Sequence, residues 1–174
     1  MNKTLPVLGF AAFSGTGKTT LLKQLIPLLA TQGVRVGVIK HAHHNFDIDQ
    51  PGKDSYELRK AGARQMLVAS ARRWALMTEN DVAGEPSLDA LVKRLDPESI
   101  DMVLVEGYKH IPFARIELHR PALGHPLLYP DDSNIIAVAA DAPIDSAGLP
   151  LLDLNDAAAV TAFVLSWLSV QQAP

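Results

Sequence analysis

Residues Ala12–Thr19 read Ala-Phe-Ser-Gly-Thr-Gly-Lys-Thr, and these residue types at this spacing are typical of a loop that binds phosphate. Gly15 and Gly17 permit backbone angles at which successive N–H groups point inward at phosphate oxygens. Lys18 can reach the terminal phosphates with its charge, and Thr19 can offer its hydroxyl to Mg²⁺. At the first position of the pattern, alanine replaces the usual glycine. We predict that nucleotide phosphates are bound by Ser14, Gly15, Thr16, Gly17, Lys18, Thr19 and Thr20.

A carboxylate at the end of a neighbouring strand commonly helps to hold Mg²⁺ beside such a loop. Glu106 has that placement, because it ends an apolar run and is followed by Gly107, which lets the chain turn beside phosphate. An ordinary strand-end acid that faces solvent is the alternative. The candidate ligands of Mg²⁺ are Thr19, Asp49 and Glu106.

The polar loop from His41 to Lys53 contains Asp49 and two further candidate site residues, Asp47 and Lys53. One residue separates Asp47 from Asp49, so in an extended segment both carboxylates face the same way. Either could approach Mg²⁺ or position a water molecule, and Asp49 is preferred because the chain turns sharply after it. Lys53 could neutralise charge that develops on a phosphate. The catalytic candidates are therefore Lys18, Asp49 and Lys53, with a solvated loop as the alternative for the last two.

The sequence leaves open the roles of Asp141 and of three histidines. Asp141 follows an apolar strand at the sheet edge where ligands bind in open α/β sheets, and its carboxylate could accept hydrogen bonds from N1 and N2 of guanine. It could instead cap the turn before Pro143. The histidines His41, His43 and His44 are crowded as in some metal-binding tracts, but a polar loop or partner surface is the preferred interpretation.

The composition narrows the class of protein. With 174 residues, the chain is expected to form a single nucleotide-binding domain over residues 1–174. A net charge of −3 provides no global basic field, so no nucleic-acid partner is expected. The absence of cysteine excludes disulfides and thiolate metal sites within the chain. No apolar stretch is long enough to cross a membrane and the N-terminus lacks a secretory pattern, so a cytoplasmic protein with no membrane partner is expected.

The hydrophobic pattern predicts alternating strands and helices. Buried parallel strands are indicated by the short apolar runs Val7–Phe13, Asp101–Glu106 and Ile135–Ala139, and Val34–Ile39 is expected to form a further strand. Helical spacing follows the phosphate loop and recurs after Asp156, and shorter helices are expected over 54–62 and 87–95. The segment D-S-Y-E from Asp54 suits a capping box.

Two remaining segments are expected to form antiparallel or edge structure. Gln65–Ala71 and Trp74–Thr78 predict a hairpin, and Ala114–His119 alternates as an edge strand does. We therefore predict an α/β fold with three layers, in which a mostly parallel sheet carries the antiparallel hairpin at its edge.

A resemblance to a known family is carried by the phosphate loop, residues 41–55 (HAHHNFDIDQPGKDS) and residues 101–109 (DMVLVEGYK). Phosphate loops are shared by very many proteins, so the diagnostic segments are residues 47–56 (DIDQPGKDSY) and 105–109 (VEGYK). With them, nearly the whole chain resembles the MobB family of molybdopterin-guanine dinucleotide biosynthesis adapter proteins. The resemblance implies a homodimer with a P-loop NTPase fold that binds GTP and Mg²⁺ and hydrolyses GTP weakly. It also implies assistance to the MobA guanylyltransferase, which attaches GMP to molybdopterin. The family's phosphate role falls on Gly15, Gly17, Lys18 and Thr19 and its strand-end acid on Glu106, while Asp49 and Lys53 match its second segment.

Three functions are compatible with these residues. The first is a GTP-binding adapter with slow Mg²⁺-dependent hydrolysis, which suits a site with no obvious strong general base. The alternative is a P-loop small-molecule kinase or ATP-dependent ligase, whose acceptor would sit near residues 41–53. The third is a binding module that keeps nucleotide as a structural clamp. Nucleotide preference rests on the resemblance alone, and the exposed hairpin over 65–78 could pair with a copy of itself in a dimer.

Overall fold

The computed structural model describes residues 4–42, 46–80 and 86–173. The chain divides into two compact units, which we call the main unit (Met1–His41 with Ser87–Pro174) and the inserted unit (Ala42–Pro86). Within the described residues, no helix is both long enough and apolar enough to cross a membrane.

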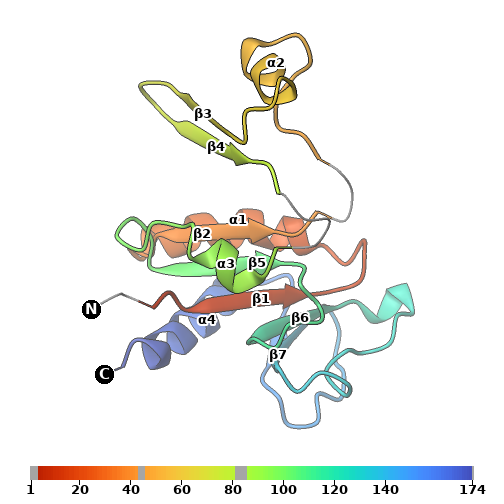
Figure 1. The fold of residues 1–174 in the computed structure, drawn as a ribbon. Coiled ribbons are helices and arrows are strands. Elements are labelled where there is room, and N and C mark those ends of the chain that lie inside the picture. Colours follow the sequence, from red (N-terminus) through yellow and green to blue (C-terminus); the bar gives the residue numbers. More distant parts are fainter. Residues whose placement is uncertain (1–3, 43–45, 81–85, 174) are drawn as a thin grey trace. The chain divides into compact units, whose positions relative to one another are not determined.

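The main unit is built on a six-stranded sheet in the order β2-β5-β1-β6-β7-β8, and Figure 1 labels these strands except β8. Every neighbouring pair of strands in this sheet is parallel. The carboxyl ends of these strands therefore meet at one edge of the sheet, which is where ligands bind in open α/β sheets. The strands are β1 (Val7–Ala11), β2 (Val36–Lys40), β5 (Met102–Glu106), β6 (Arg115–His119), β7 (Ile135–Ala140) and β8 (Leu151–Asp153).

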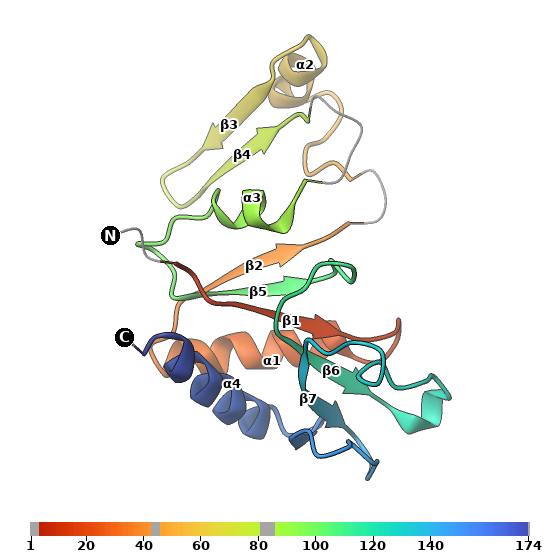
Figure 2. The ribbon, with the colours of Figure 1, turned by 60° about the horizontal axis from the view of Figure 1, so that its bottom comes forward.

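Helices cover both faces of this sheet, so the predicted three-layer α/β fold is confirmed. The helices α1 (Lys18–Thr31) and α4 (Ala157–Gln171) lie on one face, and α3 (Leu88–Val92) lies on the other (Figure 2). Successive side chains of β5 point to opposite faces of the sheet. Leu104 packs with α1 and α4, whereas Val103 and Val105 pack on the α3 side. Side chains cap two of these helices, since Ser87 accepts a hydrogen bond from Ala90 N and Asp156 accepts two from the first turn of α4.

The prediction that residues 114–119 form an edge strand is wrong. β6 lies between β1 and β7, and all of its residues are buried. Its alternation arises because the polar residues Arg115 and Glu117 form hydrogen bonds to a covering segment. Glu117 accepts hydrogen bonds from the backbone N–H groups of residues 128 and 129 at 2.8 and 2.9 Å. Hydrogen bonding thus permits a polar pattern inside the sheet.

The inserted unit contains α2 (Asp54–Lys60), β3 (Gln65–Ala69) and β4 (Trp74–Thr78). The antiparallel hairpin is confirmed, but it forms a two-stranded sheet of its own instead of extending the edge of the parallel sheet. Local turn chemistry explains the pairing, because Ser70 N and Oγ both bond to the carbonyl of Arg73. Such local signals specify which strands form the hairpin and carry no information about the sheet it joins.

The predicted capping box at Asp54 is also wrong. The residue that caps α2 is Lys53, and Asp54 is already helical. The carboxylate of Glu57 reaches back to the N–H of Gly52 at 3.3 Å, so it serves the turn that precedes the helix.

Candidate functional site

The phosphate loop connects β1 to α1 at the carboxyl edge of the sheet. Gly15 and Gly17 have φ angles of 82° and 103°, a region that glycine enters without steric cost. Gly17 is the N-cap of α1 and provides no side-chain cap to the first-turn N–H groups. Thr16 is 2% exposed, and its hydroxyl donates to the carbonyl of Phe13 at 2.9 Å, which stabilises the loop internally. The loop thus presents a helix N-terminus of the kind that binds anions.

Lys18 lies over this loop, because its Nζ donates to the carbonyl of Ala12 at 3.4 Å. Burial lowers the pKa of the Lys18 ammonium, and the nearby charge of Glu106 partly opposes that change. Lys40 and Lys109 add a further repulsion. A phosphate group placed here would relieve this repulsion, so the electrostatics favour an anionic ligand.

Glu106 ends β5, the strand that pairs with β1, so it lies at the same edge as the phosphate loop. It continues the alternation of Met102 and Leu104, and its side chain therefore faces the α1 side of the sheet. In the register of the adjacent strand its partner is Lys40, whose Nζ is 3.7 Å from the Glu106 carboxylate. The structure thus brings Lys18 and Glu106 together as their positions in the sequence predict.

These residues fit Mg²⁺ bound together with a nucleotide. The hydroxyl of Thr19, exposed in the first turn of α1, and the carboxylate of Glu106 are the oxygen ligands that Mg²⁺ prefers. Among the residues that the structure describes, no three histidines or acids gather into a group able to hold a metal ion. The ion would therefore depend on phosphate oxygens and water for its remaining ligands.

A tight turn follows Glu106 and fixes its position. Gly107 has a φ of 107° and Tyr108 a φ of 55°, while the N–H of His41 donates to the Glu106 carbonyl at 2.8 Å. The rings of His41 and Tyr108 lie 5.0 Å apart. A Cβ atom at position 107 would lie 2.5 Å from the Cβ of His41, so this close approach requires glycine.

Replacing Gly107 with alanine is expected to destabilise the protein by about 2 kcal/mol, because the left-handed backbone and the contact with His41 both disfavour a side chain. Urea unfolding measures the change. Gly33→Ala is the matched control, because Gly33 also has a positive φ but open space around its Cβ position. A loss at position 107 no greater than at position 33 would show that the contact with His41 is accommodated.

Asp141, the candidate for base recognition, is engaged by a residue that sequence reasoning missed. Arg120 donates from Nη1 to the Asp141 carboxylate at 2.6 Å and from Nε to the carbonyl of Thr16 at 2.8 Å. Its Nη2 lies 3.3 Å from the side-chain oxygen of Asn155. Arg120 directly follows β6, so the rule that ligand sites lie at the carboxyl ends of parallel strands would have found it. The edge-strand prediction for residues 114–119 left the carboxyl end of this strand out of the predicted site.

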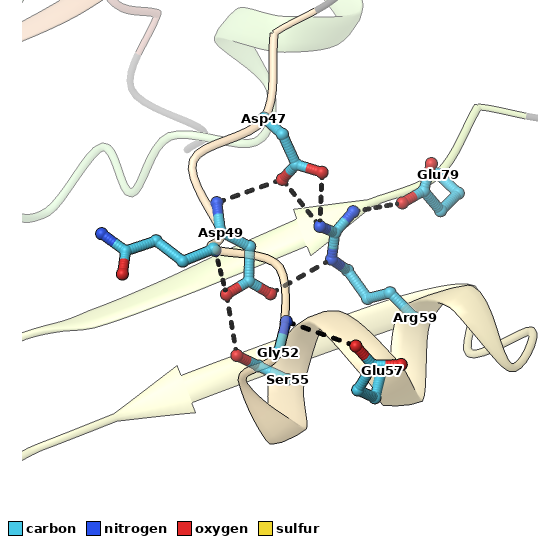
Figure 3. Close-up of polar contacts among 8 residues, drawn as sticks. Asp47, Asp49, Gly52, Ser55, Glu57, Arg59 and Glu79 are labelled. Atoms are coloured by element: carbon cyan, nitrogen blue, oxygen red, sulfur yellow. Dashed lines mark hydrogen bonds and ion pairs between the residues drawn. The ribbon is translucent and has the colours of Figure 1, made fainter.

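In the inserted unit, Asp47 and Asp49 converge on one guanidinium group (Figure 3). Arg59, whose side chain is 7% exposed, donates to Asp47 at 2.6 and 2.7 Å and to Glu79 at 2.7 Å, and lies 3.4 Å from Asp49. The hydroxyl of Ser55 also donates to Asp49 at 2.9 Å. Arg59 is the second residue that sequence reasoning missed. Asp49 is therefore a firmly held carboxylate.

The remaining candidate residues are exposed or lie outside the described part of the chain. Lys53 is exposed at the start of α2, and the roles of Asp49 and Lys53 toward phosphate stay predictions. Ser14 and Thr20 are exposed in the phosphate loop and the first turn of α1. His43 and His44 lie outside the described residues.

The carboxyl group of Asp47 is expected to titrate below its ordinary value. Hydrogen bonds from Arg59 lower its pKa, with help from the N–H of Asp49 and a smaller effect of the Lys60 charge. This group therefore stabilises the folded state above its unfolded pKa of about 4, and that contribution is lost as pH falls through the lower folded pKa. NMR titration should show the pKa of Asp47 rising in Arg59→Gln and changing little in Lys60→Ala. An ordinary pKa in the unmodified protein would contradict the contact.

Residues 7–141 match the family described as molybdopterin guanine dinucleotide synthesis protein B, or MobB. The chain belongs to this family. Membership places it among the proteins of molybdopterin guanine dinucleotide synthesis.

Individual members of the MobB family resemble the chain over nearly its full length. It is 52% identical over 168 residues to the molybdopterin-guanine dinucleotide biosynthesis adapter protein of Escherichia coli (strain K12), covering 96% of this chain and 95% of that protein. It is 44% identical to the adapter protein of the same description in Haemophilus influenzae, with 97% and 92% covered.

Solved MobB structures have the same fold. A crystal structure of molybdopterin-guanine biosynthesis protein B superimposes with a TM-score of 0.73 at 25% identity, covering 94% of this chain and 99% of that one. Bacillus subtilis MobB superimposes with a TM-score of 0.72 at 24% identity, covering 93% and 97%.

Proposed function

We propose that this member of the MobB family is a GTP-binding adapter with weak Mg²⁺-dependent GTPase activity, which assists the MobA guanylyltransferase in attaching GMP to molybdopterin. One observation carries the nucleotide part of the proposal. The phosphate loop, the Lys18 ammonium and the Glu106 carboxylate lie together at the carboxyl edge of a parallel sheet. The adapter part is supported by the names of the relatives, since two of them, at 52% and 44% identity, are described as adapter proteins.

Each part of the proposed site has its own chemical role. The loop amides and the N-terminus of α1 bind the phosphates, and the Lys18 ammonium neutralises their terminal charge. Thr19 and Glu106 hold Mg²⁺, which would supply charge neutralisation at the phosphates when bound. Asp49 and Lys53 are proposed to act on the metal and on the developing charge, respectively. No residue stands out from the sequence as a strong general base for water, which suits slow turnover.

The proposed homodimer draws support from the surface of the inserted unit. The register of β3 and β4 places Leu67 opposite Leu76 and Ala69 opposite Trp74, so these side chains share one face of the hairpin. Leu67 is 55% and Trp74 66% exposed, and apolar side chains of this size are usually covered. A second copy of the chain is the proposed cover.

A competitive titration of GTP against ATP, with and without Mg²⁺, tests the proposal when oligomeric mass is measured on the same samples. We expect preferential GTP binding, slow release of phosphate without any acceptor, and the mass of a dimer. Release that appears only when a metabolite acceptor is added would instead identify a kinase or ligase. Binding without release at any protein concentration would leave a nucleotide clamp, and no binding would overturn the assignment.

A further inference from the structure

The segment that follows β6 contacts the phosphate loop at two points. Arg120 donates from Nε to the carbonyl of Thr16, and the ring of His125 stacks on the ring of Phe13 with centroids 4.4 Å apart and planes 15° from parallel. The exposed residues of the loop, Ser14 and Gly15, lie in the sequence between these two contacts. The loop is therefore held on both sides of its exposed portion by one segment of chain.

Buried polar contacts anchor this segment in turn. The Glu117 carboxylate is 1% exposed and accepts the N–H groups of Leu128 and Tyr129. Arg115 donates to Asp132 at 2.5 Å, which adds a second attachment of the segment to β6. Burying a carboxylate is costly unless it is hydrogen-bonded, so these bonds specify one position of the segment. Arg120 consequently approaches the loop from a fixed support.

Peptide geometry converts the Arg120 contact into an effect on nucleotide binding. A trans peptide is planar, so the carbonyl of Thr16 and the N–H of Gly17 point in opposite directions. Arg120 holds that carbonyl toward itself, and it thereby sets the direction of the Gly17 N–H. If this peptide turned over, a carbonyl oxygen would replace an N–H group at the anion site and would repel phosphate.

We infer that Arg120 is a positioning residue of the phosphate loop, which keeps the Thr16–Gly17 peptide in the orientation that binds phosphate. The inference rests on the proposed function in that the loop binds a nucleoside triphosphate. Asp141 and Asn155 hold the other nitrogens of the guanidinium group, so their contacts keep Nε aimed at Thr16. An effect exerted through the loop backbone does not depend on the base of the nucleotide.

Two ligands measured on two variants test this inference. In Arg120→Ala, the affinities for Mg²⁺–GTP and for inorganic tripolyphosphate, which has no base, should fall by the same factor of about ten, as expected for loss of a charge-assisted hydrogen bond. Arg120→Lys should recover part of both affinities, because an ammonium can still donate to the Thr16 carbonyl. Isothermal titration calorimetry gives the affinities, and melting curves without ligand check that each variant is folded.

Arg35→Ala is the matched control. Arg35 also bonds to a carboxylate and to a carbonyl, those of Asp101 and Glu98, but it precedes β2 at the opposite edge of the sheet. Its loss should leave both affinities unchanged. A loss confined to GTP would assign Arg120 to the base and overturn the inference, as would unchanged affinities in both Arg120 variants. If the unmodified protein binds neither ligand, the proposed function itself fails and the inference fails with it.

Discussion

Lys18→Ala is expected to weaken the binding of GTP by about 100-fold, the largest loss of affinity that we predict for any single residue. The ammonium group lies over the loop and bonds to its Ala12 carbonyl, partly withdrawn from water. Charges interact more strongly where water is excluded, so its contact with a terminal phosphate is worth more than that of an exposed lysine. The variant also removes one of the positive charges near Glu106, which adds repulsion toward phosphate.

Titration calorimetry with GTP and with GMP measures this prediction. The affinity for GMP should change much less, since GMP lacks the terminal phosphates that Lys18 is proposed to reach. Lys23→Ala is the control, because Lys23 is an exposed lysine further along α1. GTP affinity that is the same in the Lys18 and Lys23 variants would remove the basis for assigning this loop to phosphate.

Glu106→Gln is expected to leave GTP binding within a few-fold of the unmodified protein while it slows Mg²⁺-dependent hydrolysis by about 100-fold. Glutamine has nearly the same shape but lacks the charge that would attract the metal ion. The fold should tolerate the change, because the Lys40 side chain is 64% exposed and a 3.7 Å ion pair with an exposed lysine contributes little to stability. The Mg²⁺ concentration needed for half-maximal hydrolysis should rise.

Single-turnover phosphate release over a range of Mg²⁺ concentrations separates the effect on the metal from the effect on binding. Glu98→Gln supplies the comparison, because Glu98 is an exposed acid that precedes the same strand at the opposite edge of the sheet. Unaltered turnover and unaltered metal dependence in Glu106→Gln would assign Glu106 a structural role.

Much of the main unit could be predicted because the sequence patterns that indicate its strands and helices extend over only a few residues. The apolar runs that became β1, β5 and β7 lie inside the sheet and are largely buried on both faces, and continuous apolar character is the direct consequence of that burial. The run that became β2 is also apolar, but β2 is an edge strand in which only Ile39 is buried. The placement of Glu106 beside Lys18 follows from the same signals, since neighbouring parallel strands bring their carboxyl ends together. β8 was not predicted, because its three residues are too few to show a pattern.

The failures share a cause, which is that partners distant in the sequence are invisible to a local pattern. β6 resembles an edge strand until the segment that forms hydrogen bonds to Arg115 and Glu117 is seen. The hairpin over residues 65–78 was paired correctly, but its membership of a separate sheet depends on which hydrogen bonds form elsewhere. Arg59, central to the inserted unit, lies 12 positions from Asp47 and 20 from Glu79.

By itself, then, the amino-acid sequence determined the phosphate loop, the alternation of strands and helices, and the acid at the end of β5, because backbone freedom at glycine and hydrophobic periodicity act over a few residues. Only the tertiary structure decided that Arg120 joins Thr16, Asp141 and Asn155, residues 104, 21 and 35 positions away. A guanidinium group can bond to any carbonyl or carboxylate within reach. Which acceptors come within reach is set by the order of strands in the sheet.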